Sequence, residues 1–241
     1  MGDVFGFVNN ILDSVMGISS HNDDPFHEER IMYNTTMAAS IEIANEKRQM
    51  NDQIRIRNPE FNPEEMLAYA KKVFELLINT RYTQNIDSIE HCLHNDLYQN
   101  ICSEYNQLKA QNLLNFIKNI SVYQKQIKSY SIIDNNEVMT INIKARFMSY
   151  FITADTRQYV RGNRYDAKAY LAEMKFTKNK KYDKAEEKIP TNCPNCGAPL
   201  DEAYINVCSY CHTVVPLPKK EWLLISNDMR ETTIENMMKK F

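Results

Sequence analysis

Four cysteines near the carboxyl terminus form two C-x-x-C pairs, Cys193 with Cys196 and Cys208 with Cys211, and eleven residues separate the pairs. Two thiols three residues apart on a tight turn can face one ion, and a second such turn completes a tetrahedron of sulfur ligands. Gly197 directly follows the first pair, where the turn needs a left-handed backbone. The spacing therefore predicts a zinc site with these four cysteines as its ligands.

Two other kinds of chemistry use cysteine pairs at this spacing, namely disulfide cross-links and thioredoxin-like redox motifs. A redox C-x-x-C belongs beside a βαβ unit, and the order of elements expected here contains none. No Lys or Arg precedes the first apolar residues, so we expect no export signal and prefer thiols or metal ligands to a disulfide framework. Because four thiolates close a tetrahedral site, the expected zinc is structural rather than catalytic.

Charge decides whether the cysteine module is suited to nucleic acid. Between Cys193 and Val215 the charged side chains are Asp201 and Glu202, and a zinc ion with four thiolates adds further negative charge. The whole chain has a net charge of -2. Since a phosphate backbone is bound by Lys and Arg, we expect no nucleic-acid partner.

A second group of metal-ligating residue types occurs around residue 91. On a helix His91 and His94 share a face with Asp87 and Glu90, so a second metal site can be drawn there. In the alternative that we favour, Cys92 packs inward with its neighbour Leu93. His94 then lies near the N-cap of the next helix, and His91 is exposed.

Helical periodicity dominates the first half of the chain. Asn62 is a suitable N-cap, and Pro63 then occupies the first helical position. Pro25 begins an earlier segment with a narrow apolar stripe, after a strongly amphipathic stretch at the amino terminus. The helices expected are residues 3–17, about 25–50, about 63–80, 86–93 and about 95–116.

The period changes to two in the second half, as is typical of half-buried strands. Residues 134–136 (Asp-Asn-Asn) predict a turn, and residues 161–163 (Arg-Gly-Asn) lie in an expected polar loop. The strands expected are residues 119–133, 137–151, 167–178 and 221–226. Helices followed by strands predict an α+β fold in which the helices pack on one face of an antiparallel sheet.

The stretches "FNPEEMLAYAKKVFELL", "HNDLYQNI", "MKFTK" and "EWLLI" resemble, in this order, the Tim44-like family. The resemblance covers roughly residues 58–228. It implies a cone-shaped fold of the nuclear-transport-factor-two-like kind, with helices on a curved antiparallel sheet and often an apolar pocket. The family is associated with binding and with scaffolding at the membrane periphery. Some bacterial members carry a zinc ribbon that begins "CPNCGAPL", as this chain does.

These observations predict four parts: an amino-terminal helical arm (1–57), a Tim44-like core (58–178), an inserted zinc ribbon (179–220), and a last core strand with a tail (221–241). We expect one structural Zn²⁺.

The function expected is that of a non-catalytic binding or scaffold protein, cytoplasmic or membrane-peripheral. It would meet a protein partner, or a second copy, through residues 1–57, or make a peripheral membrane contact. An alternative is a small-molecule-binding or enzymatic cone domain, and the third is a zinc-ribbon nucleic-acid binder. For catalysis, Glu173 and Asp166 lie near the expected cone mouth, but the sequence offers neither an evident acid–base partner.

Overall fold

The computed structural model describes most of the chain and divides it into two units, Met1–Gln53 and Ile54–Phe241. The helix expected at residues 3–17, and the expected start of the next helix at Pro25, lie outside the described residues. The structure describes residues 27–180, 191–200, 208, 210–211, 213, 215 and 221–233.

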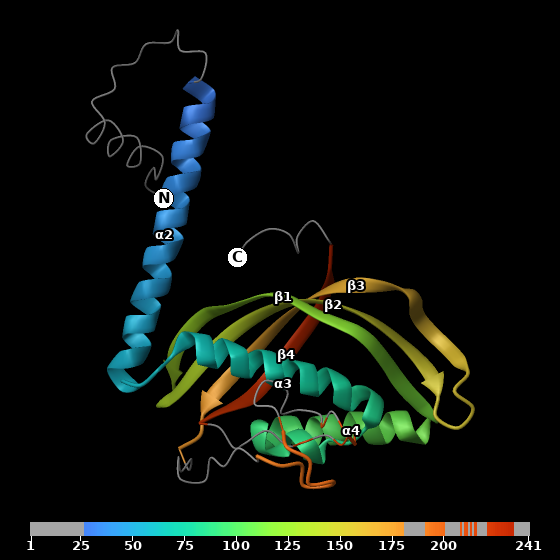
Figure 1. The fold of residues 1–241 in the computed structure, drawn as a ribbon. Coiled ribbons are helices and arrows are strands. Elements are labelled where there is room, and N and C mark those ends of the chain that lie inside the picture. Colours follow the sequence, from blue (N-terminus) through green and yellow to red (C-terminus); the bar gives the residue numbers. More distant parts are fainter. Residues whose placement is uncertain are drawn as a thin grey trace. The chain divides into compact units, whose positions relative to one another are not determined.

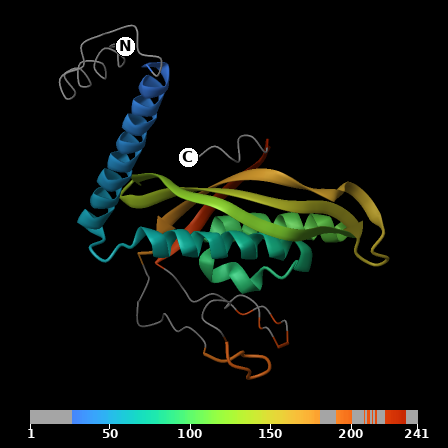
Figure 2. The same ribbon diagram turned by 45° about the horizontal axis from the view of Figure 1, so that its top comes forward.

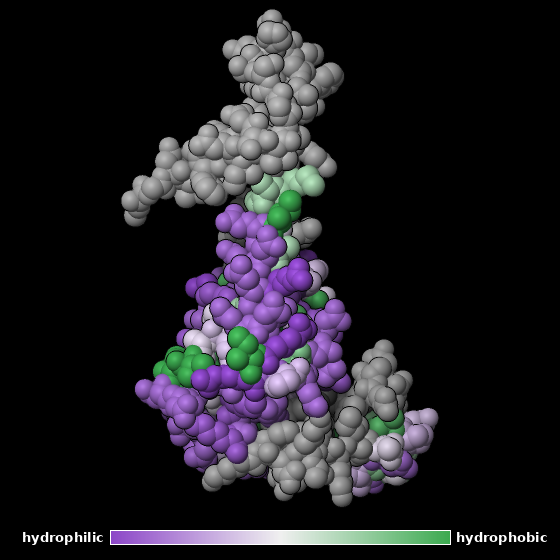
Figure 3. Space-filling view, turned by 90° about the vertical axis from the view of Figure 1, so that its left-hand side faces the viewer, coloured by the Kyte–Doolittle hydropathy of each residue, from purple (hydrophilic) through white to green (hydrophobic). Residues whose placement is uncertain are grey.

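Helix α2 (His27–Arg57) accounts for all described residues of the first unit and continues to the start of the second. It extends beyond residue 50, where the sequence predicted its end. Met37 and Ile41, one helical turn apart, leave 54% and 52% of their surface exposed. The view in Figure 3 shows α2 with a mainly hydrophilic surface and isolated hydrophobic patches.

Helix α3 (Pro63–Thr83) begins where its capping residues predict. The side-chain oxygen of Asn62 accepts hydrogen bonds from the backbone N–H groups of Glu64 (3.0 Å) and Glu65 (3.5 Å). Such a cap stabilises a helix by about 1 kcal/mol. The buried residues of α3 are Met66, Tyr69, Ala70, Val73, Phe74, Leu76, Leu77, Ile78 and Thr80.

A short 3₁₀ helix, η1 (Asp87–Cys92), and helix α4 (Asn95–Ala110) follow. The sequence predicted that this last helix continues to about residue 116, which is wrong. Asn112 adopts a left-handed backbone (φ 55°), which an α-helix does not accommodate, and Leu113 then begins the first strand. The apolar residues after Asn112 thus belong to the sheet.

The four strands form one antiparallel sheet in the order β1-β2-β3-β4. Asp134 and Asn135, both left-handed (φ 49° and 61°), make the two-residue turn between β1 and β2, in line with the predicted turn. The strands are β1 (Leu113–Ile133), β2 (Asn136–Thr153), β3 (Tyr159–Lys178) and β4 (Trp222–Thr232).

Strand β3 begins earlier than expected, and the loop predicted at residues 161–163 is wrong. Gly162 pairs with Tyr150 of β2 inside the ladder. A Cβ atom on Gly162 (φ 106°) would lie 2.7 Å from the Cα atom of Tyr150, so only glycine allows this approach. A glycine between polar neighbours resembles a loop in sequence, yet here it marks close backbone contact within a strand.

Helices α3 and α4 lie on the same face of the sheet, as Figures 1 and 2 both show. The ring of Tyr69 in α3 contacts that of Phe176 in β3 (centroids 6.0 Å apart). The hydroxyl of Tyr69 donates to the carbonyl of Trp222 (2.9 Å), and Trp222 is 6% exposed. The sheet residues that are fully buried are Met139, Ile141, Ile143, Ala145, Ala172, Met174, Phe176 and Leu224.

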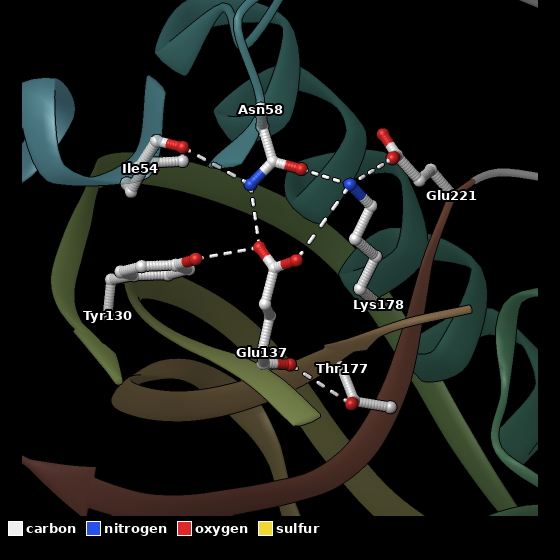
Figure 4. Close-up of polar contacts among 7 residues, drawn as sticks. All are labelled: Ile54, Asn58, Tyr130, Glu137, Thr177, Lys178 and Glu221. Atoms are coloured by element: carbon white, nitrogen blue, oxygen red, sulfur yellow. Dashed lines mark hydrogen bonds and ion pairs between the residues drawn. The ribbon is translucent and has the colours of Figure 1, made fainter. Parts of the chain in front are cut away.

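A polar cluster joins five segments at one end of the sheet, where β1 turns into β2 (Figure 4). The carboxylate of Glu137 accepts from Asn58 Nδ2 (2.6 Å) and from the hydroxyl of Tyr130 (2.7 Å). Lys178 Nζ lies 2.7 Å from Glu221 Oε1 and 3.9 Å from Glu137 Oε1, and it also donates to Asn58 Oδ1. We call these five residues the paired end, because each charge there has an opposite partner.

Candidate metal centre

The sulfur atoms of the four predicted ligands lie together in the structure. Cys193 Sγ is 3.6 Å from Cys211 Sγ, and Cys196 Sγ is 3.7 Å from Cys208 Sγ. All four sulfurs lie within 4.8 Å of one another. Each C-x-x-C pair therefore contributes one thiol to each of the two closest contacts.

Each of the two cysteine turns has a backbone hydrogen bond of the same pattern. The N–H of Cys193 donates to the carbonyl of Ala198 (2.7 Å), and the N–H of Cys208 donates to that of Thr213 (2.9 Å), in both cases five residues further on. Gly197 has the left-handed backbone (φ 73°) that its place after the first pair predicts. Two similar turns thus present their thiols to a common point.

The spacing of the sulfurs fits a metal better than a disulfide. A tetrahedral zinc with ligands at about 2.3 Å places neighbouring sulfurs about 3.8 Å apart. A disulfide needs sulfurs about 2 Å apart, and all four cysteines are free thiols. The donor set, four soft sulfur atoms at near-tetrahedral spacing, is the one that structural zinc sites use.

Two polar side chains orient Cys211. Asn195 Nδ2 donates to Thr213 Oγ1 (2.9 Å) and lies 3.7 Å from Cys211 Sγ, while Thr213 Oγ1 lies 3.3 Å from the same sulfur. Hydrogen bonds with the Thr213 hydroxyl, and then with its backbone N–H, lower the pKa of the Cys211 thiol to about 5. The thiolate is the form that binds a metal. Asn195 and Thr213 therefore support the metal site from outside the ligand set.

The pKa of the Cys196 thiol is shifted in the opposite direction, upwards. The Ala198 N–H lowers the pKa of the Cys196 thiol, but hydrogen bonds among the neighbouring sulfurs and burial raise it to about 12. Negative charge that gathers on neighbouring sulfurs opposes further ionisation. A dication at the centre of the cluster would offset this repulsion, which is a physical reason for the site to take a metal.

Neither Asn195 nor Thr213 was singled out from the sequence. Both follow directly from positions in the cysteine turns: Asn195 precedes Cys196, and Thr213 lies two residues after Cys211. Asn and Thr at such positions are frequent in turns for reasons that involve only the backbone. Their contact with each other depends on how the two turns meet, which spacing along the chain does not reveal.

The residues around His91 are not brought together as a metal site. Within the described residues, the cysteine cluster is the group of three or more ligating side chains whose donor atoms converge. Cys92 and Leu93 are buried and His94 caps α4, as the favoured alternative predicts. His91 is half-buried, so its expected exposure was wrong.

Of the two candidate catalytic carboxylates, Asp166 is exposed and Glu173 is half-buried in ion pairs. Glu173 pairs with Lys128 (2.6 Å) and more loosely with Lys175 (3.9 Å). The bond to Lys128 lowers the pKa of Glu173, which keeps the carboxylate ionised. Its neighbours Ala172 and Met174 lie on the buried face, so Glu173 lies on the face turned away from the helices, and its expected place at the cone mouth was wrong.

The order of α3, α4 and the three strands β1, β2 and β3 agrees with a known family. A family model described as Tim44-like domain matches residues 48–187, more than half of the chain. The chain belongs to the Tim44-like family. The resemblance noted in the sequence is thereby confirmed for the core, whereas the match ends before Cys193 and does not extend to the cysteine cluster.

Two further findings bear on this Tim44-like chain. Among curated proteins, none matches it. Within the part of the chain that the structure describes, no helix is both long enough and apolar enough to cross a membrane.

Proposed function

We propose that the chain is a non-catalytic binding or scaffold protein with a Tim44-like core and a zinc ribbon that is held by one structural Zn²⁺. The observation that carries the proposal is the closed cluster of four sulfurs beside a core of this family. A site with four protein ligands keeps no position for water or substrate. Binding and membrane-peripheral scaffolding are the roles associated with the family.

The proposed parts keep the predicted boundaries: arm 1–57, core 58–178, ribbon insertion 179–220, and last strand with tail 221–241. We propose that the arm meets a protein partner or a second copy. The support is the exposure of Met37 and Ile41 on consecutive turns of α2. Apolar side chains that are repeated on one helix face are typical of a helix that docks on protein.

Metal analysis tests the zinc part of the proposal. The purified full chain should contain one zinc per molecule, and Cys196→Ser should lose it because three thiolates hold zinc less tightly than four. Cys102→Ser is the matched control, since Cys102 is a free cysteine of α4 outside the cluster. Iron in place of zinc, or equal zinc in both variants, would contradict the assignment.

Partner capture tests the scaffold part. The full chain and two single variants, Ile41→Lys and Ala39→Lys, are compared by light scattering for self-association and by quantitative crosslinking in a lysate of the source cells. Both substitutions add one charge to α2, but Ala39 lies on the side of the helix opposite Met37. We expect Ile41→Lys alone to reduce association. Equal association in all three chains would contradict a contact through this face.

One cavity favours a second function, the binding of a small molecule. It has a volume of about 540 Å³ and lies at the end of the sheet that carries the paired end. Val138, Leu223 and Ile225 give it apolar walls, and Lys175 and Lys178 line its polar side. Pockets of this size take small ligands. A ligand that copurifies with the chain and is lost in Leu223→Arg would favour this function.

A further inference from the structure

Three arginines gather among aromatic rings at the opposite end of the sheet, where β2 turns into β3. We call Arg157, Arg161 and Arg164, with the rings that they contact, the arginine end. Two of the three, Arg157 and Arg164, line a cavity of about 430 Å³. The other residues of the cavity wall are Tyr82, Phe116, Tyr150, Ile152 and Tyr159.

The rings form a continuous wall. Tyr82 meets Phe116 edge-on with the centroids 4.8 Å apart, Phe116 lies 5.0 Å from Tyr150, and Tyr150 lies 6.3 Å from Tyr159. These rings come from α3 and from three strands, so the fold itself fixes their positions. A fixed aromatic wall offers apolar contact with little loss of conformational entropy on binding.

Two of the guanidinium groups lie over rings of this wall, and the third lies over Phe151. Arg157 Cζ is 5.8 Å from the centre of the Tyr82 ring, and its Nη1 donates to the Tyr82 hydroxyl (3.3 Å). Arg164 Cζ lies 5.1 Å from the centre of Tyr159. Arg161 Cζ lies 4.7 Å from the centre of the Phe151 ring. Stacking on rings holds a guanidinium in place while its remaining N–H donors stay available to a ligand.

The charge at this end is positive on balance, with three arginines against Asp155 and Asp166 in the same segment. Within the described residues, no Asp or Glu forms an ion pair with Arg157, Arg161 or Arg164. Asp155 lies in the same hairpin, but its carboxylate accepts from the N–H of Thr156 (2.6 Å). Two oriented guanidiniums beside the aromatic wall, Arg157 and Arg164, therefore lack an acidic partner, and so does Arg161 over Phe151.

We propose that the arginine end binds an acidic segment of a partner protein. Carboxylates of the segment pair with Arg157 and Arg164, in the two-pronged geometry that guanidinium and carboxylate share. An apolar side chain of the same segment packs on Phe116 and Ile152 inside the cavity. The inference rests on the proposed binding function and adds a second contact surface, in the core rather than in the arm.

Charge and shape favour a peptide over other anionic partners. A nucleic acid is held along many phosphates, whereas this chain has a net charge of -2 and places only three arginines here, with Asp155 and Asp166 in the same segment. A bilayer surface meets protruding side chains, whereas Arg157 and Arg164 line a concave site. Arg and Tyr are also the residue types that dominate protein interfaces.

The test measures binding of a short fluorescent peptide of alternating glutamate and leucine to the full chain by anisotropy. The same peptide with glutamine in place of glutamate is the ligand control. We expect Arg157→Gln with Arg164→Gln to weaken binding about tenfold or more, because both carboxylate partners are lost. Lys109→Gln with Lys125→Gln removes the same charge from exposed sites in α4 and β1 and should change binding less than about twofold.

Further variants separate recognition from folding. Arg157→Lys with Arg164→Lys keeps the charge but loses the planar fork, so binding should lie between that of the parent and that of the glutamine variant. All variants should show the parent's circular dichroism. The proposal would be overturned if the double substitution of Arg157 and Arg164 by glutamine weakened binding no more than that of Lys109 and Lys125. It would also be overturned if the parent chain bound the glutamine peptide as tightly as the glutamate peptide.

Other anions provide the remaining outcomes. Arginine-dependent binding of oligothymidylate, or of vesicles of phosphatidylcholine with phosphatidylglycerol, in the absence of peptide binding would also overturn the proposal. If the peptide fails to bind while Ile41→Lys still reduces association, the arginine end is not a docking surface but the scaffold function stands. If Ile41→Lys leaves association unchanged while the peptide binds, the arginine end is a docking surface and the proposed contact through α2 is wrong.

Discussion

The charged side chains at the two ends of the sheet differ in their partners. At the paired end, Glu137 and Lys178 lie among hydrogen-bond partners and a second carboxylate, Glu221. At the other end, Arg157 and Arg164 lie over aromatic rings, and no carboxylate of the described chain pairs with them. Charge that is satisfied internally contributes to the fold, whereas charge left unsatisfied beside a cavity is available to a ligand.

The two ends also differ in how many segments of the chain supply their residues. The paired end brings together Asn58, Tyr130, Glu137, Lys178 and Glu221, which belong to five separate segments and meet only when the core is closed. The three arginines lie within eight residues of one another, on a single hairpin. Losing a member of the first group should therefore affect folding, and losing one of the second should affect binding.

The largest effect on the free energy of unfolding is expected when one aromatic residue near each end is replaced by alanine and the two losses are compared. Trp222 is 6% exposed beside the paired end, and Tyr165 is 75% exposed near the arginines. Trp222→Ala should lower the free energy of unfolding by about 3–5 kcal/mol because it leaves a cavity in the core. Tyr165→Ala should change it by less than about 0.5 kcal/mol. Urea unfolding measures both, and equal losses would remove the contrast.

Removing the carboxylate of the paired end should have the next largest effect. Glu137→Ala leaves the Tyr130 hydroxyl without its acceptor and leaves Asn58 Nδ2 with the Ile54 carbonyl as its acceptor. It also leaves Lys178 with one carboxylate, Glu221, and the amide oxygen of Asn58. A loss of about 2–4 kcal/mol is expected, because the side chain of Glu137 is 13% exposed and buried polar groups are costly to leave unpaired. Glu64→Ala, on an exposed helix start, is the control. A loss below about 0.5 kcal/mol would show that the cluster is dispensable.

A smaller effect should appear at alkaline pH. Burial, and then the hydrogen bond to Glu137, raise the pKa of Tyr130 from 10.0 to about 12. The folded state therefore holds this proton more tightly than the unfolded state, so the contribution is complete below pH 10 and is lost as the pH rises towards 12. Tyr130→Phe should flatten the decline in unfolding free energy between these values. An unchanged slope would contradict the shift.

The sequence predicted those features that depend on neighbouring residues. Asn62 and Pro63 mark the start of α3, and the two C-x-x-C pairs mark the sulfur cluster, because cap and ligand geometry are set within a few residues. It failed where distant segments decide: Asn112 ends α4 at the point where the sheet takes the next residues, and Gly162 continues β3 because Tyr150 lies against it.

Both ends of the sheet were missed for the same reason. Tyr82, Phe116 and Arg157 stand far apart in the chain, and no periodicity links them. The same holds for Asn58 and Lys178. Polar and aromatic residues on a strand read as a solvated face, so their convergence becomes visible only with the strand register known.

Thermal unfolding with and without the glutamate–leucine peptide tests the contrast most directly. The three chains are the parent, Glu137→Gln, and Arg157→Gln with Arg164→Gln. A saturating ligand that binds the folded state stabilises it by about 3 kcal/mol at a hundredfold excess over Kd, which corresponds to about 5–10 °C for a chain of this size. We predict that Glu137→Gln has a lower Tm than the parent but the same upward shift with peptide. The arginine variant should keep a Tm near that of the parent and show at most about half of the parent's shift, because a tenfold weaker Kd leaves about 1.4 kcal/mol of ligand stabilisation. An equal shift in all three chains, or a shift in none, would contradict the division of the sheet into a structural end and a binding end.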